Sequence, residues 1–189
     1  MDEVEREVIE RSRRGDKDAF RLLVEKYQRP IIATVYRLVG SRFHQDLEDI
    51  AQDILVKIHK SLDKFDFDRG TKFSTWLFTF VRNHCFDVLK KRRLSTHSLG
   101  ASDDAAARLP SGVAAPDGDL LNDELSLEIE RAIFRLPEEQ RTAFILREYQ
   151  ALGYAEIAEI MQCSEGTVKS RLYRAKEALR ERLAPYLNR

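Results

Sequence analysis

The chain has 189 residues, and its 32 Lys and Arg side chains balance its 32 Asp and Glu side chains, so the formal net charge is zero. This length suits one domain or two small ones, and the neutral total gives no hint of a single acidic or basic partner. The two cysteines, Cys85 and Cys163, are far apart and belong to no CxxC or Cys/His grouping, which argues against a zinc site and a disulfide framework. No apolar run approaches the ~20 residues that span a bilayer, and the N-terminus is too charged for a signal peptide, so we expect a cytoplasmic protein.

Residues 1–14 are highly charged and predict at most a short amphipathic lead-in helix. Asp16 is a candidate N-cap for a helix over residues 17–39, because its carboxylate can accept hydrogen bonds from unpaired amides of the first turn. Apolar residues recur three or four positions apart through that range. Pro30 falls inside the pattern and predicts a kink or a break in the helix.

The next helix is expected over residues 45–62, and its outer face is acidic near the N-terminus. Asp49, Gln52 and Asp53 lie on this face. Two interpretations stay open. The carboxylates can stabilise the helix through its macrodipole by roughly 0.3–1 kcal/mol each, or they can form a docking surface for a partner.

Residues 64–72 predict a loop, because Asp68, Arg69 and Gly70 are typical of a turn. A third strong helix is predicted over residues 73–94. Basic side chains are interleaved with aromatic ones along both segments. Rings on which bases can stack, beside cations that meet phosphates, are what single-stranded DNA binding requires, with about 1–3 kcal/mol per stacked base.

The alternative for these aromatic residues is that they form a hydrophobic core. One helical stripe cannot bury all of them, so we expect Phe73, Trp76 and Phe80 to face a core, while Phe78 and Phe86 lie elsewhere. For Trp76 the core interpretation is the favoured one.

Between residues 95 and 119, Gly, Pro, Ser, Ala and Asp dominate and no apolar period survives. Such a composition predicts a flexible, acidic linker. The linker divides the chain into an N-terminal domain of residues 1–94 and a C-terminal domain of residues 120–189. We therefore predict an all-α protein with two small helical domains.

The C-terminal domain is predicted to hold four helices. Pro137 suits the first turn of the second helix, and Glu138 and Glu139 suit its positive N-terminal end. The last two helices form a helix-turn-helix over residues 152–183, with Ser164 as N-cap of the final helix.

The final helix shows two faces. A buried stripe at helical spacing is predicted from Val168, Leu172, Ala175 and Leu179. Ser170, Tyr173 and Arg174 point away from that stripe, with Lys169 at its border. Hydroxyl, aromatic and cationic groups on the outer face are typical of a helix that enters the DNA major groove, and the alternative is an ordinary solvated face.

No Gly-rich phosphate loop, HExxH or GxSxG motif occurs, and the four His residues are scattered. We therefore expect no enzymatic activity, no cofactor and no metal site.

Taken together, four segments resemble RNA polymerase sigma factors of the sigma-70 family, specifically the small two-domain type called extracytoplasmic-function (ECF) sigma factors. DLEDIAQDILVKIHKSLDKFD resembles region 2.2 of the family, and FSTWLFTFVRNHCFDVLKKRR resembles regions 2.3 and 2.4. RLPEEQRTAFILREY resembles region 4.1, and GYAEIAEIMQCSEGTVKSRLYRAKEALR resembles region 4.2. All four segments occur in the family's order, around an acidic linker.

The resemblance implies a promoter-specificity subunit that binds the polymerase core, through the β′ coiled coil and the β subunit, and promoter DNA as duplex and as single strand. It implies a role in polymerase docking for Asp49, Gln52 and Asp53. It implies contacts with the melted −10 strand, including a flipped base, for Phe65, Arg69, Lys72 and Asn83. It implies contacts with the −35 element for Thr167, Lys169, Ser170, Arg171, Tyr173 and Arg174.

The resemblance also implies regulation by an anti-sigma factor, which can hold such a protein at the membrane, and no small-molecule substrate. Two residues depart from the family pattern: Gly153 stands where a Ser or Thr cap is common, and Ala151 replaces a common Gly. Two other functions stay open. A free-standing helix-turn-helix regulator would not need the aromatic, basic helix of the first domain, and an RNA-binding or scaffold protein would use the aromatic residues only as core.

Overall fold

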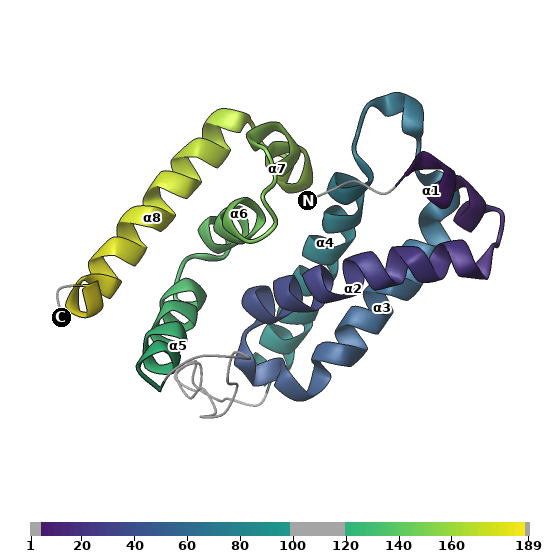
Figure 1. Ribbon diagram of the computed structural model, residues 1–189. Helices are drawn as coiled ribbons and strands as arrows, with labels where there is room; N and C mark the ends of the chain where they lie inside the picture. Colours follow the sequence, from purple (N-terminus) through teal and green to yellow (C-terminus); the bar gives the residue numbers. More distant parts are fainter. Residues whose placement is uncertain (1–4, 99–119, 188–189) are drawn as a thin grey trace.

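The computed structural model describes residues 5–98 and 120–187, and these residues form helices and connecting turns without a β-strand. The predicted all-α class is therefore confirmed. Figure 1 shows two groups of helices side by side, one built from the N-terminal half of the chain and one from the C-terminal half. Most of the predicted linker, from residue 99 to residue 119, lies outside the described residues.

Residues 5–98 of the N-terminal half form four α-helices and three short 3₁₀ segments. Its elements are α1 (Arg6–Arg13), α2 (Lys17–Val39), η1 (Ser41–Asp46), α3 (Leu47–Ser61), η2 (Leu62–Lys64), η3 (Phe67–Arg69) and α4 (Phe73–Ser98). Asp16 caps α2 as predicted, because its Oδ1 accepts hydrogen bonds from the amides of Asp18 and Ala19 at 2.9 and 3.1 Å. Of the kink or break predicted at Pro30, the break is wrong, since α2 continues through it as one helix.

Helix α4 buries more than one stripe of side chains. Phe73 is buried as predicted and Phe80 is half-buried, but the expectation that Phe78 lies outside the core is wrong, since its ring is completely buried. The reason is that α4 has neighbours on several sides: it packs against α2, α3 and α7. The helix also runs to Ser98, four residues past its predicted end.

The C-terminal half consists of the four predicted helices. They are α5 (Leu120–Phe134), α6 (Glu138–Glu148), α7 (Tyr154–Met161) and α8 (Glu165–Leu187). Helix α8 packs against α5, α6 and α7 and is the longest of the four.

The two halves pack directly against each other, which local sequence patterns did not predict. Helix α2 contacts α5 and α6, and α4 contacts α7. Gln150 donates a hydrogen bond to Thr34 at 2.9 Å in a buried position between the halves. Gly40, at φ +87°, lies so close to the Phe134 ring that an added Cβ would be 2.2 Å from it. The described helices therefore share one continuous apolar core.

Candidate nucleic-acid interface

The helix-turn-helix is formed by α7, a three-residue turn and α8. Gly153 precedes α7 in an extended conformation, and its amide donates to the Glu156 carboxylate at 2.6 Å. The Glu156 carboxylate thus makes one half of a capping box, and glycine has no side chain with which to make the other half. Gln162 ends α7 in the left-handed conformation at φ 52°. Ser164 then caps α8 as predicted, since its Oγ accepts a hydrogen bond from the Thr167 amide at 3.1 Å.

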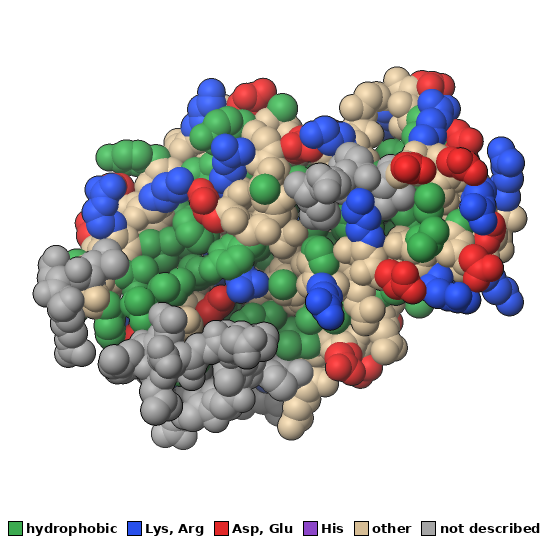
Figure 2. Space-filling model, viewed as in Figure 1, with side chains coloured by type: hydrophobic (Ala, Val, Ile, Leu, Met, Phe, Trp, Pro, Cys, Tyr) green, Lys and Arg blue, Asp and Glu red, His purple; other side chains and the backbone are tan. Residues whose placement is uncertain are grey.

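The faces of α8 match the predicted stripe. Each of the four stripe residues is buried: Val168, Leu172, Ala175 and Leu179. The opposite face is exposed: Lys169, Ser170, Tyr173 and Arg174. Tyr173 is 67% exposed, so its ring is accessible to a partner. Figure 2 shows Lys and Arg side chains along the outer edge of α8, above a hydrophobic band between α8 and the helices beside it.

Three residues near the start of α8 make polar or cation–ring contacts with neighbouring residues. Arg171 is half-buried and forms an ion pair with Glu139 of α6 at 3.0 Å, and its Nη1 donates to the Cys163 sulfur at 3.4 Å. Thr167 is half-buried, and its carbonyl oxygen accepts from the Ser170 hydroxyl at 2.9 Å. Lys169 lies over the Tyr154 ring at 5.4 Å. These contacts orient the start of the helix.

The loop before α4 presents a different arrangement. Phe65 is only 4% exposed and packs against the rings of Phe67, Phe73 and Trp76. Its side chain therefore supports the loop from the core, and direct stacking of a base on it is not available in this structure. The half-buried ring on this loop belongs to Phe67, which the sequence analysis did not single out as a contact residue.

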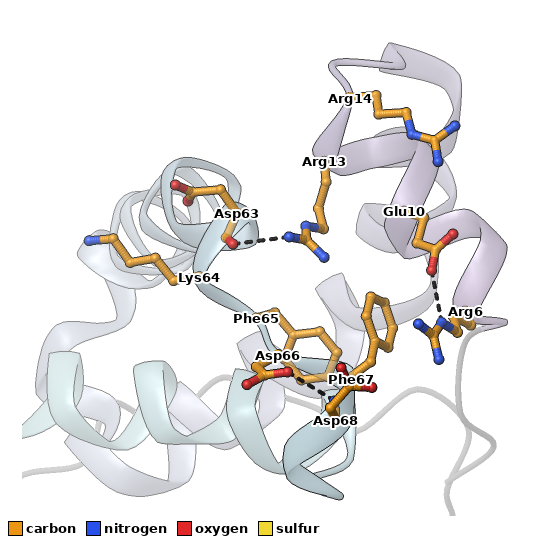
Figure 3. Close-up of a pocket in the computed structure, with 10 residues that line it drawn as sticks. All are labelled: Arg6, Glu10, Arg13, Arg14, Asp63, Lys64, Phe65, Asp66, Phe67 and Asp68. Carbon is orange, nitrogen blue, oxygen red and sulfur yellow. Dashed lines mark hydrogen bonds and ion pairs between the residues drawn. The ribbon is translucent and has the colours of Figure 1, made fainter.

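A cavity of about 700 Å³ lies between this loop and α1, within the ~300–1,000 Å³ that is common for ligand pockets. Figure 3 shows Phe67 directed into it between two arginines of α1. The Arg6 and Arg13 guanidinium groups lie 4.5 and 5.9 Å from the Phe67 ring centre. The lining residues are Arg6, Glu10, Arg13 and Arg14 of α1 with residues 63–68. Helix α1, expected to be only a lead-in, thus forms one wall of this cavity.

The other predicted −10 residues lie at the surface around α4. Arg69 is exposed and is 3.8 Å from the Asp66 carboxylate. Lys72 forms an ion pair with Glu156 of α7 at 3.1 Å. Asn83 is exposed, and its Oδ1 accepts from Arg82 at 3.2 Å. The structure therefore places Arg69 and Lys72 at the N-terminal end of α4, with Asn83 farther along the same helix.

The Glu156 carboxyl group is held in its ionised form. Partial burial opposes its charge, but the hydrogen bond from the Gly153 amide and the ion pair with Lys72 outweigh that opposition, so the pKa of its carboxyl lies below its ordinary value. A negative charge from α7 thus faces a predicted strand-binding lysine at neutral pH.

The predicted docking residues lie together on the exposed side of α3: Asp49, Gln52 and Asp53. Beneath them is His84 of α4, whose Nε2 lies 4.0 Å from the Asp53 carboxylate and whose Nδ1 is 2.6 Å from the Lys57 ammonium. Burial, followed by the neighbouring Lys57 charge, lowers the pKa of His84. The ring is therefore neutral at pH 7, and its Nδ1 is the acceptor for Lys57.

The two cysteines differ in exposure. Cys85 is buried in α4, and burial raises the pKa of its thiol to about 12, whereas Cys163 is half-buried beside Arg171. Among the described residues, no group of three or more His, Cys, Asp and Glu side chains is placed to hold a metal ion. In the same residues, no helix combines the length and apolar character needed to cross a membrane.

Comparison with known proteins accounts for both halves. The family description "Sigma-70 region 2" matches residues 23–94, and "Sigma-70, region 4" matches residues 126–179. The RNA polymerase sigma-H factor of Pseudomonas aeruginosa is 37% identical, covering 98% of this chain and 96% of that protein. The chain belongs to the sigma-70 family. The ECF RNA polymerase sigma-E factor of Escherichia coli K12, 36% identical over 96% of this chain and 95% of its own length, places it in the ECF group.

Solved structures agree with this ECF sigma factor assignment. The sigma factor RpoE of Bartonella quintana, solved in complex with the anti-sigma factor NepR, has a TM-score of 0.72 and 28% identity, covering 87% of this chain and 96% of that one. CnrH, solved with the cytosolic domain of CnrY, has a TM-score of 0.67 at 22% identity, covering 94% and 96% of the two chains, and supports the fold alone. The match to region 2 as well as region 4 favours a transcription initiation factor over a free-standing helix-turn-helix regulator.

Proposed function

We propose that this ECF sigma factor reads the −35 element with the outer face of α8. The exposure of that face is the main observation in support of the proposal. Lys169, Ser170, Tyr173 and Arg174 are exposed beside a fully packed inner stripe, on a helix capped by Ser164. Arginine and lysine can donate to guanine O6 and N7 in the major groove, and hydroxyl groups can donate to or accept from groups on the base edges. Arg171 and Thr167 lie at the border of this face, where they can contact phosphates.

The proposed −10 site is the loop of residues 65–72 with the neighbouring part of α4. The cavity beside Phe67 has a partly exposed ring for stacking and arginines that can pair with phosphate, which together suit a base turned out of a melted strand. Arg69, Lys72 and Asn83 would follow the strand on either side of that base, while Phe65 holds the loop in place.

The proposed polymerase-docking surface is the exposed patch of Asp49, Gln52 and Asp53. Carboxylates aligned on one helix suit a basic helical partner, and the resemblance identifies that partner as the β′ coiled coil, with further contacts to the β subunit. Asp49 also lies in the first turn of α3, where a carboxylate stabilises the helix, and the two roles are compatible.

Sigma factors are non-catalytic regulatory proteins, and we propose that this chain likewise acts by binding alone, in the cytoplasm, without a cofactor. An anti-sigma factor is a proposed further partner, since the similar sigma factor RpoE of Bartonella quintana was solved in complex with the anti-sigma factor NepR. Such a partner would cover surfaces that polymerase needs.

The decisive test is transcription in vitro with purified core polymerase on a library of promoters randomised at the −10 and −35 positions. We expect the full chain to direct initiation from a subset of sequences that share both elements. Initiation that is unchanged by addition of the chain, or a chain that does not co-elute with core polymerase on gel filtration, would contradict the proposed function.

A further inference from the structure

A buried histidine of α4 lies directly beneath the proposed polymerase-docking surface. Helix α4 packs against α3, and His84 is only 9% exposed. Its two ring nitrogens face two charged residues of α3: Nδ1 is 2.6 Å from the Lys57 ammonium, and Nε2 is 4.0 Å from the Asp53 carboxylate. These three residues connect the interior of the domain to the docking surface.

The position of Lys57 along α3 matters, because Lys57 comes four residues after Asp53. Side chains at this spacing are neighbours on a helix surface, and a carboxylate followed four residues later by a lysine is the favourable orientation for an ion pair. Such a pair would place a positive charge beside Asp53 and reduce its attraction for a basic partner. In this structure the Lys57 ammonium instead contacts the His84 ring.

The Asp53 carboxylate therefore stays accessible. Its side chain is 73% exposed, and the 4.0 Å that separates it from His84 Nε2 is too long for a hydrogen bond. The Nε2 atom is buried and has no hydrogen-bond partner among the described residues. The neutral ring thus binds the lysine without neutralising the aspartate.

Protonation of His84 would reverse this arrangement. Both nitrogens of a charged ring carry protons, so neither can accept from Lys57. The ammonium would be repelled toward Asp53, and the imidazolium itself would lie 4.0 Å from that carboxylate.

The charged groups that act on the ring are Asp53 and Lys57 of α3 with Asp87 and Lys91 of α4. Burial and then Lys57 have the largest effects, and both keep the pKa of His84 below its ordinary value. The ring therefore becomes charged only below about pH 6.5.

We propose that His84 is a positioning residue of the polymerase-docking surface: its neutral ring holds the Lys57 ammonium away from Asp53, and its protonation releases that ammonium and weakens docking. This inference rests on the docking role proposed for Asp53. It gives the surface a dependence on pH between about 7.5 and about 5, a range in which carboxylates of ordinary pKa stay ionised.

The test is the affinity of the full chain for purified core polymerase, measured by biolayer interferometry from about pH 7.5 to about pH 5. His84→Leu fills the position but accepts no hydrogen bond. His84→Asn keeps an acceptor close to the place of Nδ1 and does not become protonated. His84→Leu with Lys57→Met also removes the displaced ammonium. The control is His59→Leu, which removes an exposed imidazole from another face of α3.

At neutral pH we expect His84→Leu to bind polymerase about threefold more weakly than the parent, because one docking carboxylate of two is neutralised and the loss of both should cost about tenfold. His84→Asn should bind like the parent. Addition of Lys57→Met to His84→Leu should restore the affinity, because no ammonium is left to pair with Asp53. A misfolded His84→Leu chain would not recover on loss of a lysine.

The pH series gives a second readout. The ratio of the parent's affinity to that of His84→Asn cancels any titration of polymerase itself. We expect this ratio to fall by up to about threefold toward pH 5, for the same electrostatic reason. His59→Leu should follow the parent throughout.

Three results would overturn the inference: equal affinities of the parent and His84→Leu, no recovery in the double variant, or a ratio that stays constant with pH. Asp53→Ala in the same assay separates these outcomes from failure of the docking role. If Asp53→Ala weakens binding and His84→Leu does not, only the role of His84 is lost. If Asp53→Ala binds as tightly as the parent, the docking role and the inference are both overturned.

Discussion

The two surfaces that we propose to contact DNA differ in how exposed they are. The outer face of α8 is exposed over Lys169, Ser170 and Tyr173, and its contacts come mainly from its own half. Around the start of α4, by contrast, Thr71, Lys72 and Arg82 pair with Glu159, Glu156 and Glu139 of the other half. The comparison teaches that one proposed DNA-contact surface can be exposed in the free chain while the other, equally well folded, is partly covered by the opposite half.

The strongest way to sharpen this comparison is to remove the base contacts of the free face. Lys169→Ala with Arg174→Ala should abolish discrimination between promoters with and without the −35 element, because each lost base contact costs ~1–3 kcal/mol. Transcription in vitro from the two promoter types measures the ratio. Lys176→Ala with Arg180→Ala is the matched control, since those cations pair with Glu148 and Glu177 lower on the same helix. An equal loss of promoter discrimination in both variants would contradict the proposal that the outer face of α8 reads the −35 element.

A second variant tests whether the halves are packed in solution. Gly40→Ala forces a side chain into φ +87° and into the Phe134 ring, so we expect a loss of ~2–5 kcal/mol in the free energy of unfolding. Gly15→Ala is the control, because Gly15 has the same φ and no atom within 4 Å of its Cβ position. Urea unfolding of both proteins gives the difference. If the halves are separated, the two substitutions will cost the same.

The docking patch should respond without any change of fold. Asp49→Ala with Asp53→Ala should weaken association with core polymerase at least about tenfold, since exposed acidic groups contribute to a charged interface and little to their own domain. Biolayer interferometry gives the affinity and circular dichroism the helix content. Asp18→Ala with Glu25→Ala removes the same charge from exposed positions of α2 and should leave binding unchanged. Unchanged association of the first variant would remove the docking role.

The turn before α7 offers a stabilising change. Ala151 adopts φ 55°, in the left-handed region that costs a non-glycine residue ~1–2 kcal/mol. Ala151→Gly should therefore raise the free energy of unfolding by about 1 kcal/mol or less, because glycine also loses more freedom on folding. Thermal unfolding followed by circular dichroism measures the gain, and Ala155→Gly inside α7 should instead lower stability. A lower melting temperature for Ala151→Gly would show that no strain is relieved.

The smallest expected effect is a pH dependence from His84. Its folded pKa lies below the ordinary value of about 6.5 because burial and Lys57 disfavour the charged ring. The unfolded chain therefore takes up this proton first, so the contribution to stability is complete above about pH 6.5 and is lost as the pH falls below it. Urea midpoints between pH 7 and pH 5 should fall less steeply in His84→Gln than in the parent or in His59→Gln. If the urea midpoint of His84→Gln changes with pH as it does in the parent, His84 is not a source of the pH dependence.

Much of the fold and of the α8 face could be predicted from local patterns. The caps at Asp16 and Ser164 and the stripe from Val168 to Leu179 depend on neighbours within one helix, and periodicity reports those directly. At Pro30 the local preference of proline did not end the helix, since α2 continues from Lys17 to Val39.

The covered face of α4 could not be predicted in this way. Glu139 and Glu156 carry local roles near the starts of α6 and α7, and nothing in their spacing indicates that they also meet α4. The Thr34–Gln150 pair joins residues 116 positions apart. The prediction for Phe78 was wrong for the same reason, because the number of helices that surround α4 is a property of the tertiary structure.

The position of Glu139 between Arg82 and Arg171 has a consequence for genetics. A mutation at this codon should change two phenotypes at once: transcription from promoters with a weak −10 element and transcription from promoters with a weak −35 element. Suppressor mutations recovered from such a strain should fall in both halves of the gene, although the original lesion is a single residue.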